Sequence, residues 1–113
     1  MRLFTIILCS FFLQIAYSQS SETTKTPKDL AQEQLDAYNN RDIDAFLIPY
    51  ADSVKIYNFP NTLIMSGKEQ MRSTYSQMFK NTPNLHCELV NRMVMGNTVI
   101  DQESITGFGA DKF

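Results

Sequence analysis

The chain has 113 residues, a length that provides for one domain. Hydrophobic residues make up 43% of the sequence, which favours a packed core over wholesale disorder. The formal net charge is −2 and there is no basic run, so nothing indicates nucleic acid or an anionic membrane surface as a partner.

The first 18 residues have the pattern of a secretory signal peptide. Arg2 precedes an apolar run from Leu3 to Ala16, and small residues at Ala16 and Ser18 suit a cleavage site after Ser18. The run is short for a membrane span, which needs roughly 20 residues. We therefore expect a secreted or periplasmic protein with no stable span after cleavage; an uncleaved anchor is the alternative.

Residues 19–25 are polar and predict a loose tether ahead of the folded domain, which we place at residues 26–113. Cleavage would remove Cys9 and leave Cys87 as the single cysteine, so an intramolecular disulfide is excluded. We expect Cys87 to be a buried apolar thiol.

A first helix is predicted from Pro27 to about Asn39, with Thr26 as its N-cap. Its apolar residues recur at helical spacing, and Gln34 falls in the middle of their stripe. A glutamine there is either a core-edge residue bonded to backbone or water, or a polar contact aimed into a cavity.

A second helix is predicted from Ile43 to Tyr50, with Asp42 as N-cap and Pro49 closing it. The alternation over Ser53 to Asn58 predicts a half-buried strand with Asn58 on its inward face. Residues 62–65 predict a short strand that pairs with the strand over Ser53 to Asn58.

A third helix is predicted to open with a capping box at residues 66–69 and to bury a stripe of methionines and aromatics. Two long strands follow, Leu85 to Met95 and Thr98 to Thr106, joined by a hairpin turn. On the first strand, alternation puts Cys87 and Leu89 on one face and Arg92 on the other.

One face of the last strand places two carboxylates between two apolar residues: Val99, Asp101, Glu103 and Ile105. Either this face is solvated, or one acid lies in a cavity, where desolvation would raise its pKa and suit it to proton transfer. With one histidine and one remaining cysteine, a zinc site is implausible, and we predict no metal and no cofactor.

Three stretches together suggest a family: LDAYNNRDIDAFLIPYADSVKIYNFPN, MSGKEQMRSTYSQMF and NRMVMGNTVIDQESITG. They resemble the SnoaL-like, ketosteroid-isomerase-like group of the nuclear transport factor two superfamily, over about Thr26 to Gly107. The resemblance implies an α+β fold in which a cone-like curved antiparallel sheet wraps around three N-terminal helices and a deep apolar pocket. It also implies further strands after Gly107, so we expect a shortened domain with an incomplete sheet.

Members that isomerise ketosteroids pair an aspartate base with a tyrosine donor, and the resemblance places these positions at Asn58 and Gln34. Neither residue matches, since an amide is no base at neutral pH and a weaker oxyanion donor than a phenol. We therefore expect a retained pocket with altered chemistry.

The leading hypothesis is a pocket for a small apolar molecule, with polar contacts from Gln34 and Asn58 and a lining formed by Tyr38, Phe46, Ile56, Tyr75 and Phe79. The alternative is an enzyme, a steroid delta-isomerase-like isomerase or a polyketide cyclase-like lyase, with Asp101 or Glu103 as acid or base. The third is a module that forms a homodimer through its sheet and binds no ligand.

Overall fold

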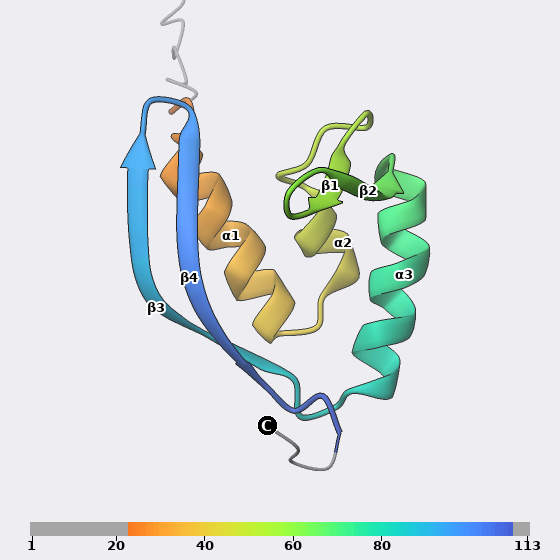
Figure 1. Cartoon of the computed structure of the whole chain (residues 1–113). Helices are drawn as coiled ribbons and strands as arrows, with labels where there is room; N and C mark the ends of the chain where they lie inside the picture. Colours follow the sequence, from red (N-terminus) through yellow and green to blue (C-terminus); the bar gives the residue numbers. More distant parts are fainter. Residues whose placement is uncertain (1–22, 110–113) are drawn as a thin grey trace, which may run out of the picture.

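A computed structural model describes residues 23–109 of the chain, so the predicted signal peptide lies outside the described residues. Two β-hairpins and three helices make up this part, and Figure 1 shows their arrangement. In chain order the elements are α1 (Pro27–Asn39), α2 (Ile43–Leu47), β1 (Lys55–Asn58), β2 (Thr62–Ser66), α3 (Lys68–Asn81), β3 (His86–Met95) and β4 (Thr98–Thr106).

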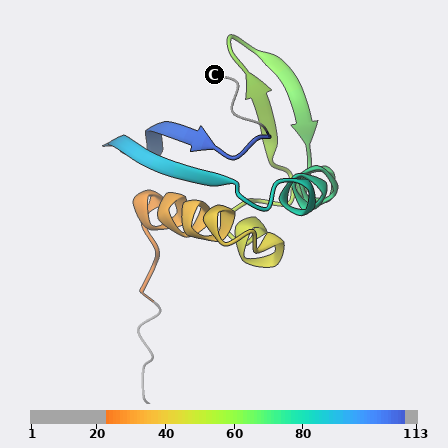
Figure 2. The same cartoon turned by 90° about the horizontal axis from the view of Figure 1, so that it is seen from below.

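Helix α1 begins as predicted. The Thr26 hydroxyl accepts a hydrogen bond from the Asp29 amide at 3.2 Å, and the Asp29 carboxylate accepts one from the Thr26 amide at 2.9 Å. This reciprocal pair satisfies two amide donors that the first helical turn leaves free. Helix α1 lies across one face of the β3–β4 hairpin (Figure 2).

The connection from α1 to α2 depends on two side chains. Arg41 has a φ of 53°, which reverses the chain, and its Nη1 donates to the Leu85 carbonyl at 3.2 Å. The Asp42 side chain accepts from the Ala45 amide at 3.1 Å and so caps α2 as predicted. Helix α2 ends at Leu47 rather than Tyr50, because Pro49 cannot continue the hydrogen-bond pattern.

Strands β1 and β2 form a hairpin of their own, with a register shift between Ile56 and Tyr57. The prediction that Asn58 faces inward is wrong, because Asn58 is exposed at the turn end of the hairpin. The predicted capping box of α3 is also absent. Gly67 is the N-cap and makes no side-chain hydrogen bond, whereas the Gln70 side chain accepts from the Ser66 amide at 2.8 Å.

The β3–β4 hairpin contains a bulge that changes which residues face the helices. Leu89 pairs with Glu103, but the next pair along is Asn91 with Gln102, so Val90 is an extra residue on β3. The alternation predicted that Arg92 lies on the other face of β3 from Leu89, and this prediction is wrong. The bulge turns Arg92 to the side of α1, where it pairs with Asp101.

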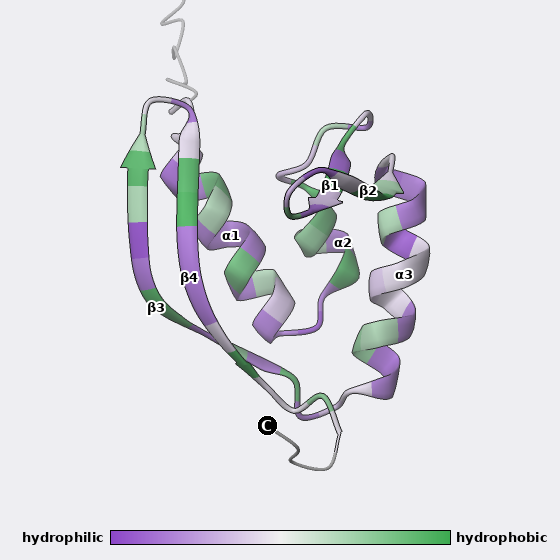
Figure 3. Cartoon of the chain, viewed as in Figure 1, coloured by the Kyte–Doolittle hydropathy of each residue, from purple (hydrophilic) through white to green (hydrophobic). Residues whose placement is uncertain are grey.

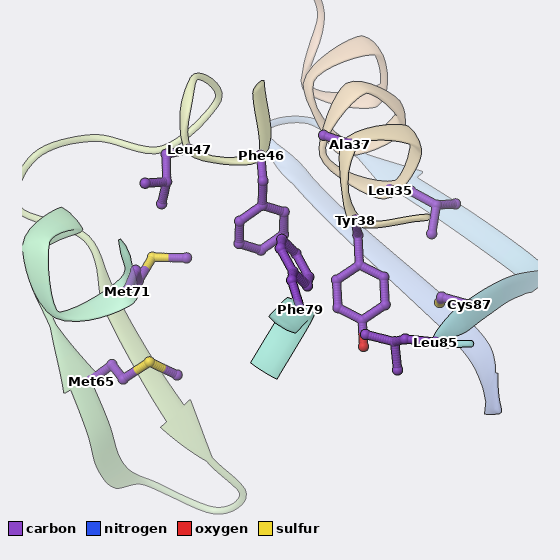
Figure 4. Close-up of a cluster of buried hydrophobic side chains, with 10 residues drawn as sticks. All are labelled: Leu35, Ala37, Tyr38, Phe46, Leu47, Met65, Met71, Phe79, Leu85 and Cys87. Carbon is purple, nitrogen blue, oxygen red and sulfur yellow. The ribbon is translucent and has the colours of Figure 1, made fainter. Parts of the chain in front are cut away.

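The core lies between the three helices and the start of β3 (Figure 4). Phe46 is its centre: it is 1% exposed and packs against Tyr75 and Phe79 with ring centroids 4.6 and 5.6 Å away. The buried residues are Leu35, Ala37, Tyr38, Phe46, Leu47, Met65, Met71, Phe79, Leu85 and Cys87.

The expected α+β class is confirmed, with three helices and antiparallel strands. Within residues 23–109 the strands form two separate two-stranded sheets, β1–β2 and β3–β4, and no closed barrel. The β3–β4 hairpin curves around α1 (Figure 1), so this pair provides the wall against which a site can form.

Candidate functional site

Two adjoining hollows open between α1 and β4. The first, of about 370 Å³, is lined by Leu30, Ala31, Gln34, Pro49, Tyr50, Val99, Asp101 and Glu103. The second, of about 270 Å³, is lined by Gln34, Leu35, Tyr38, Tyr75, Met78, Cys87, Glu103, Ile105 and Phe108. Gln34 and Glu103 belong to both linings, so the two hollows meet between these side chains.

The wall on the sheet side is the face of β4 that the sequence singled out. Val99 and Asp101 line the first hollow, Ile105 lines the second, and Glu103 lines both. Strand β4 keeps its alternation because the extra residue of the bulge is on β3. All four side chains therefore face the helices, as period-2 alternation requires.

Asp101 is held in an ion pair. Its two carboxylate oxygens accept from Arg92 Nε and Nη2 at 2.7 and 2.8 Å, and Arg92 Nη1 donates to Gln32 Oε1 at 3.0 Å. The Arg92 and Asp101 side chains are only 8% and 15% exposed. The hydrogen bonds from Arg92 hold the pKa of Asp101 below its usual value, so Asp101 stays ionised and engaged.

Glu103 differs from Asp101 in having no ion-pair partner within residues 23–109. Its charge reaches three phenols that surround the hollows, those of Tyr38, Tyr50 and Tyr75. Burial is the main cause that raises the pKa of each phenol, to about 12 for Tyr38, and the Glu103 carboxylate adds to it. The phenols are therefore protonated hydrogen-bond donors at neutral pH.

Cys87 is buried at the base of the second hollow, as the sequence predicted. Burial, and then the nearby Glu103 carboxylate, raises the pKa of the Cys87 thiol to about 11. Because the thiolate is the nucleophilic form, this thiol is a lining group and not a nucleophile at neutral pH.

The predicted site residues fall into two groups. The hollows bring together Gln34, Tyr38, Tyr75, Asp101 and Glu103. The other four lie outside both linings. Phe46 and Phe79 are enclosed in the core, Ile56 packs against that core from β1, and Asn58 is exposed. The β1–β2 hairpin stands beside α3, away from α1 and β4, which explains why its two residues are absent (Figure 1).

Tyr50 is the main lining residue that sequence reasoning missed. It was predicted as the last residue of α2, but it follows the end of that helix and packs against Phe46 with ring centroids 5.5 Å apart. The signal was Pro49, which ends the helix and lets the next residue turn toward α1.

Among residues 23–109 no cluster of three or more potential metal ligands occurs. In the same part of the chain, no helix combines the length and apolar character needed to cross a membrane.

Comparison with known families identifies the class of protein to which this chain belongs. The SnoaL-like domain family matches residues 31–112, which is most of the chain and includes every residue of the two hollows except Leu30. The chain therefore belongs to the SnoaL-like domain family, as the sequence predicted. No curated protein matches the sequence significantly.

Solved structures agree with this assignment. The chain is similar to an uncharacterized cystatin-fold protein from Novosphingobium aromaticivorans, with a TM-score of 0.70, 25% identity, and coverage of 74% of this chain and 71% of that chain. It is also similar to a SnoaL-like protein of unknown function from Burkholderia thailandensis, with a TM-score of 0.60, 25% identity and coverage of 68% and 70%. A third structure, a putative calcium/calmodulin-dependent protein kinase type II association domain from Thiobacillus denitrificans, shares the fold with a TM-score of 0.53, 19% identity, and coverage of 77% and 72%.

Proposed function

We propose that this domain binds a small, mainly apolar molecule in the two hollows between α1 and β4. The observation that carries the proposal is the lining: apolar and aromatic side chains surround two polar groups, Gln34 and Glu103, at the junction of the hollows. Ligand sites have this composition, with an apolar wall for affinity and a few polar groups for orientation. The two hollows, of about 370 and 270 Å³, together fall well within the range for small-molecule sites.

The test is to fill the first hollow. Ala31 lines it from α1, so Ala31→Trp should occupy the space of the ligand. We expect the wild-type protein to bind the neutral apolar dye N-phenyl-naphthylamine with enhanced fluorescence, and the variant to bind it at least 10-fold more weakly. Lys28→Trp adds the same ring at an exposed position of α1 outside both linings and is the matched control. Equal binding by all three proteins, or none by the wild type, contradicts the proposal.

A second candidate function is an isomerase-type or cyclase-type reaction at the same site. The observation that favours it is Glu103, a carboxylate without an ion-pair partner in the described residues, beside phenols that remain protonated. A carboxylate base can take a proton next to a carbonyl group while a phenol donates to the developing oxyanion. Asp101 is unsuited to this role because Arg92 engages both of its oxygens.

Turnover separates the two candidates. The enzyme hypothesis expects conversion of a β,γ-unsaturated cyclic ketone to its conjugated isomer, in which Glu103 moves a proton from the α to the γ carbon. Glu103→Gln should abolish this conversion and keep ketone binding. Binding of the ketone without any conversion by the wild-type protein would leave ligand binding as the function.

We further propose that a second copy of the chain covers the outer face of the β3–β4 hairpin near its tip. Met93, Met95 and Ile100 are exposed there at 57, 76 and 51%, and Met93 and Ile100 are cross-strand partners. Figure 3 shows this hydrophobic end of the hairpin. A dimer would bury these residues together with a hairpin edge that pairs with no other strand in the described part of the chain. Sedimentation should show that the wild-type chain is a dimer and that Met93→Lys dissociates it. Ser104→Lys is the control, because Ser104 is exposed on β4 toward the other end of the hairpin, and it should leave the dimer intact.

Export of the protein is also a proposal, supported by the signal-peptide pattern of the first 18 residues. Sequencing the N-terminus of the protein after expression with an intact leader tests it, and a chain that begins at Gln19 is the expected result.

A further inference from the structure

The described residues that line the two hollows carry one unbalanced negative charge. Two carboxylates face them, but Arg92 neutralises Asp101 through two hydrogen bonds, which leaves Glu103. Among residues 23–109, no lysine, arginine or histidine belongs to either lining. Glu103 is exposed to solvent, so water hydrates its charge. A ligand seated at the junction of the hollows would displace part of that water, and a cationic group on the ligand would compensate for the lost hydration.

Four aromatic residues share the linings with Glu103. Tyr50 lines the first hollow, and Tyr38, Tyr75 and Phe108 line the second. Aromatic faces attract cations through the ring quadrupole, and cages of aromatic rings recognise ammonium groups in this way. The protonated phenols add oxygen atoms that accept hydrogen bonds from an N–H group.

These two observations restrict the chemistry of the ligand. An anionic head group would meet the charge of Glu103 at close range, and like charges disfavour binding. A neutral molecule would displace water from the Glu103 carboxylate without replacing that interaction. A positively charged nitrogen would pair with the carboxylate, while an attached hydrocarbon would contact Leu30, Ala31 and Val99 in the first hollow.

We propose that the ligand is an apolar molecule with a protonated or quaternary amine, and that Glu103, together with the tyrosines that line the two hollows, binds its positive nitrogen. This inference rests on the proposed binding function and adds the charge of the ligand to it. The raised pKa values of Tyr38, Tyr50 and Tyr75 are consistent with it, because the Glu103 carboxylate contributes to each of them after burial.

Three probes with one hydrocarbon and different charges test the proposal: phenylbutylamine, phenylbutanol and phenylbutyrate. Calorimetric titration of the wild-type chain at neutral pH should give at least 10-fold tighter binding for the amine than for the alcohol, with the carboxylate weakest. Trimethylation of the amine should keep most of this preference, because cation–π attraction does not need an N–H donor.

Glu103→Gln should lower the affinity for the amine to that for the alcohol, and it should leave the affinity for the alcohol unchanged. Glu88→Gln is the matched control, because Glu88 is exposed on the same hairpin, belongs to neither lining, and its removal changes the net charge equally. If Glu103→Gln fails to fold, the salt dependence of the wild type replaces it: the advantage of the amine over the alcohol should shrink as ionic strength rises.

The outcomes separate this inference from the function on which it rests. If none of the three probes binds, the proposed binding function fails. Equal binding of all three leaves the binding function standing and overturns the inference about charge. The inference about charge is also overturned if the Glu103→Gln variant still prefers the amine. It is overturned as well if the control variant, Glu88→Gln, loses the preference for the amine.

Discussion

The Asn39 side chain pairs with the backbone of Cys87 as a neighbouring strand would. Its Nδ2 donates to the Cys87 carbonyl at 2.9 Å, and its Oδ1 accepts from the Cys87 amide at 2.7 Å. Asn39, the last residue of α1, thereby pairs with the backbone amide and carbonyl of Cys87 on β3, at the base of the second hollow. Because Arg41 also bonds the Leu85 carbonyl, the end of α1 and the start of β3 are fixed together.

Removing this amide should destabilise the fold. Asn39→Ala leaves the amide and carbonyl of Cys87 without partners in a partly buried position, and we expect a loss of about 2 kcal/mol in the free energy of unfolding. Urea denaturation followed by circular dichroism measures it. Asn40→Ala, one residue along and exposed, should cost much less. Equal losses for the two variants would show that the pairing with Cys87 contributes nothing specific.

The Arg92–Asp101 ion pair should make stability depend on pH. The folded pKa of Asp101 is lowered, so its contribution is complete above the pKa of the unfolded chain, about 4, and is lost as pH falls through the lower folded value. Asp101→Asn should cost about 2 kcal/mol at neutral pH, where it breaks a largely buried charge pair.

Comparing wild type and Asp101→Asn by urea denaturation from neutral to acidic pH checks this. The difference in unfolding free energy should stay constant down to about pH 5 and then shrink as pH falls further. A difference that persists unchanged at the lowest pH would mean that the hydrogen bonds of Asp101 matter and its charge does not.

The position of Glu103 can be tested without a ligand. Its carboxylate raises the pKa of Tyr38, Tyr50 and Tyr75 in addition to burial, so Glu103→Gln should lower these values while leaving them above 10, the ordinary pKa of a tyrosine phenol. Ultraviolet titration of the phenols at alkaline pH measures the change. Glu88→Gln should leave the titration unaltered, and an identical curve for Glu103→Gln would place that carboxylate away from the rings.

Gly107 should be irreplaceable for a steric reason. Its φ is +87°, and an added Cβ would collide with the backbone carbonyl of Asn84. We expect Gly107→Ala to cost about 3 kcal/mol, combining backbone strain with the displacement of a neighbouring strand start. Gly96→Ala, at φ +56° with open space around it, should cost about 1 kcal/mol. Thermal melting of both variants tests the difference.

Much of the fold could be predicted from local signals. Thr26 and Asp42 cap their helices as expected, and the alternation along β4 identified the face that lines the site. These predictions depend only on neighbours in sequence. The prediction for Arg92 failed because one extra residue at Val90 inverts the alternation, and nothing in the composition of β3 marks a bulge there.

The candidate site was predictable in part. Gln34 was recognised as a polar residue within an apolar stripe, and it does line both hollows. Asn58 was chosen by the same kind of parity argument, but the β1–β2 hairpin packs by α3 and not over the site. Parity gives the face of a strand, whereas the element that this face meets depends on tertiary packing.

The extra residue on β3 has a consequence for how this hairpin tolerates change. Substitutions at Val90 should matter little, since its side chain is 57% exposed. Deleting Val90 should also be tolerated, because Leu89, Asn91 and Arg92 would then face Glu103, Gln102 and Asp101 in regular alternation and the ion pair would survive. One residue added between Asn91 and Arg92 would instead exchange the two faces beyond that point and turn Arg92 to solvent. Such an insertion would leave Asp101 without its counter-ion, as a second free charge in the cavity, and so alter what the domain can hold without touching any residue that lines it.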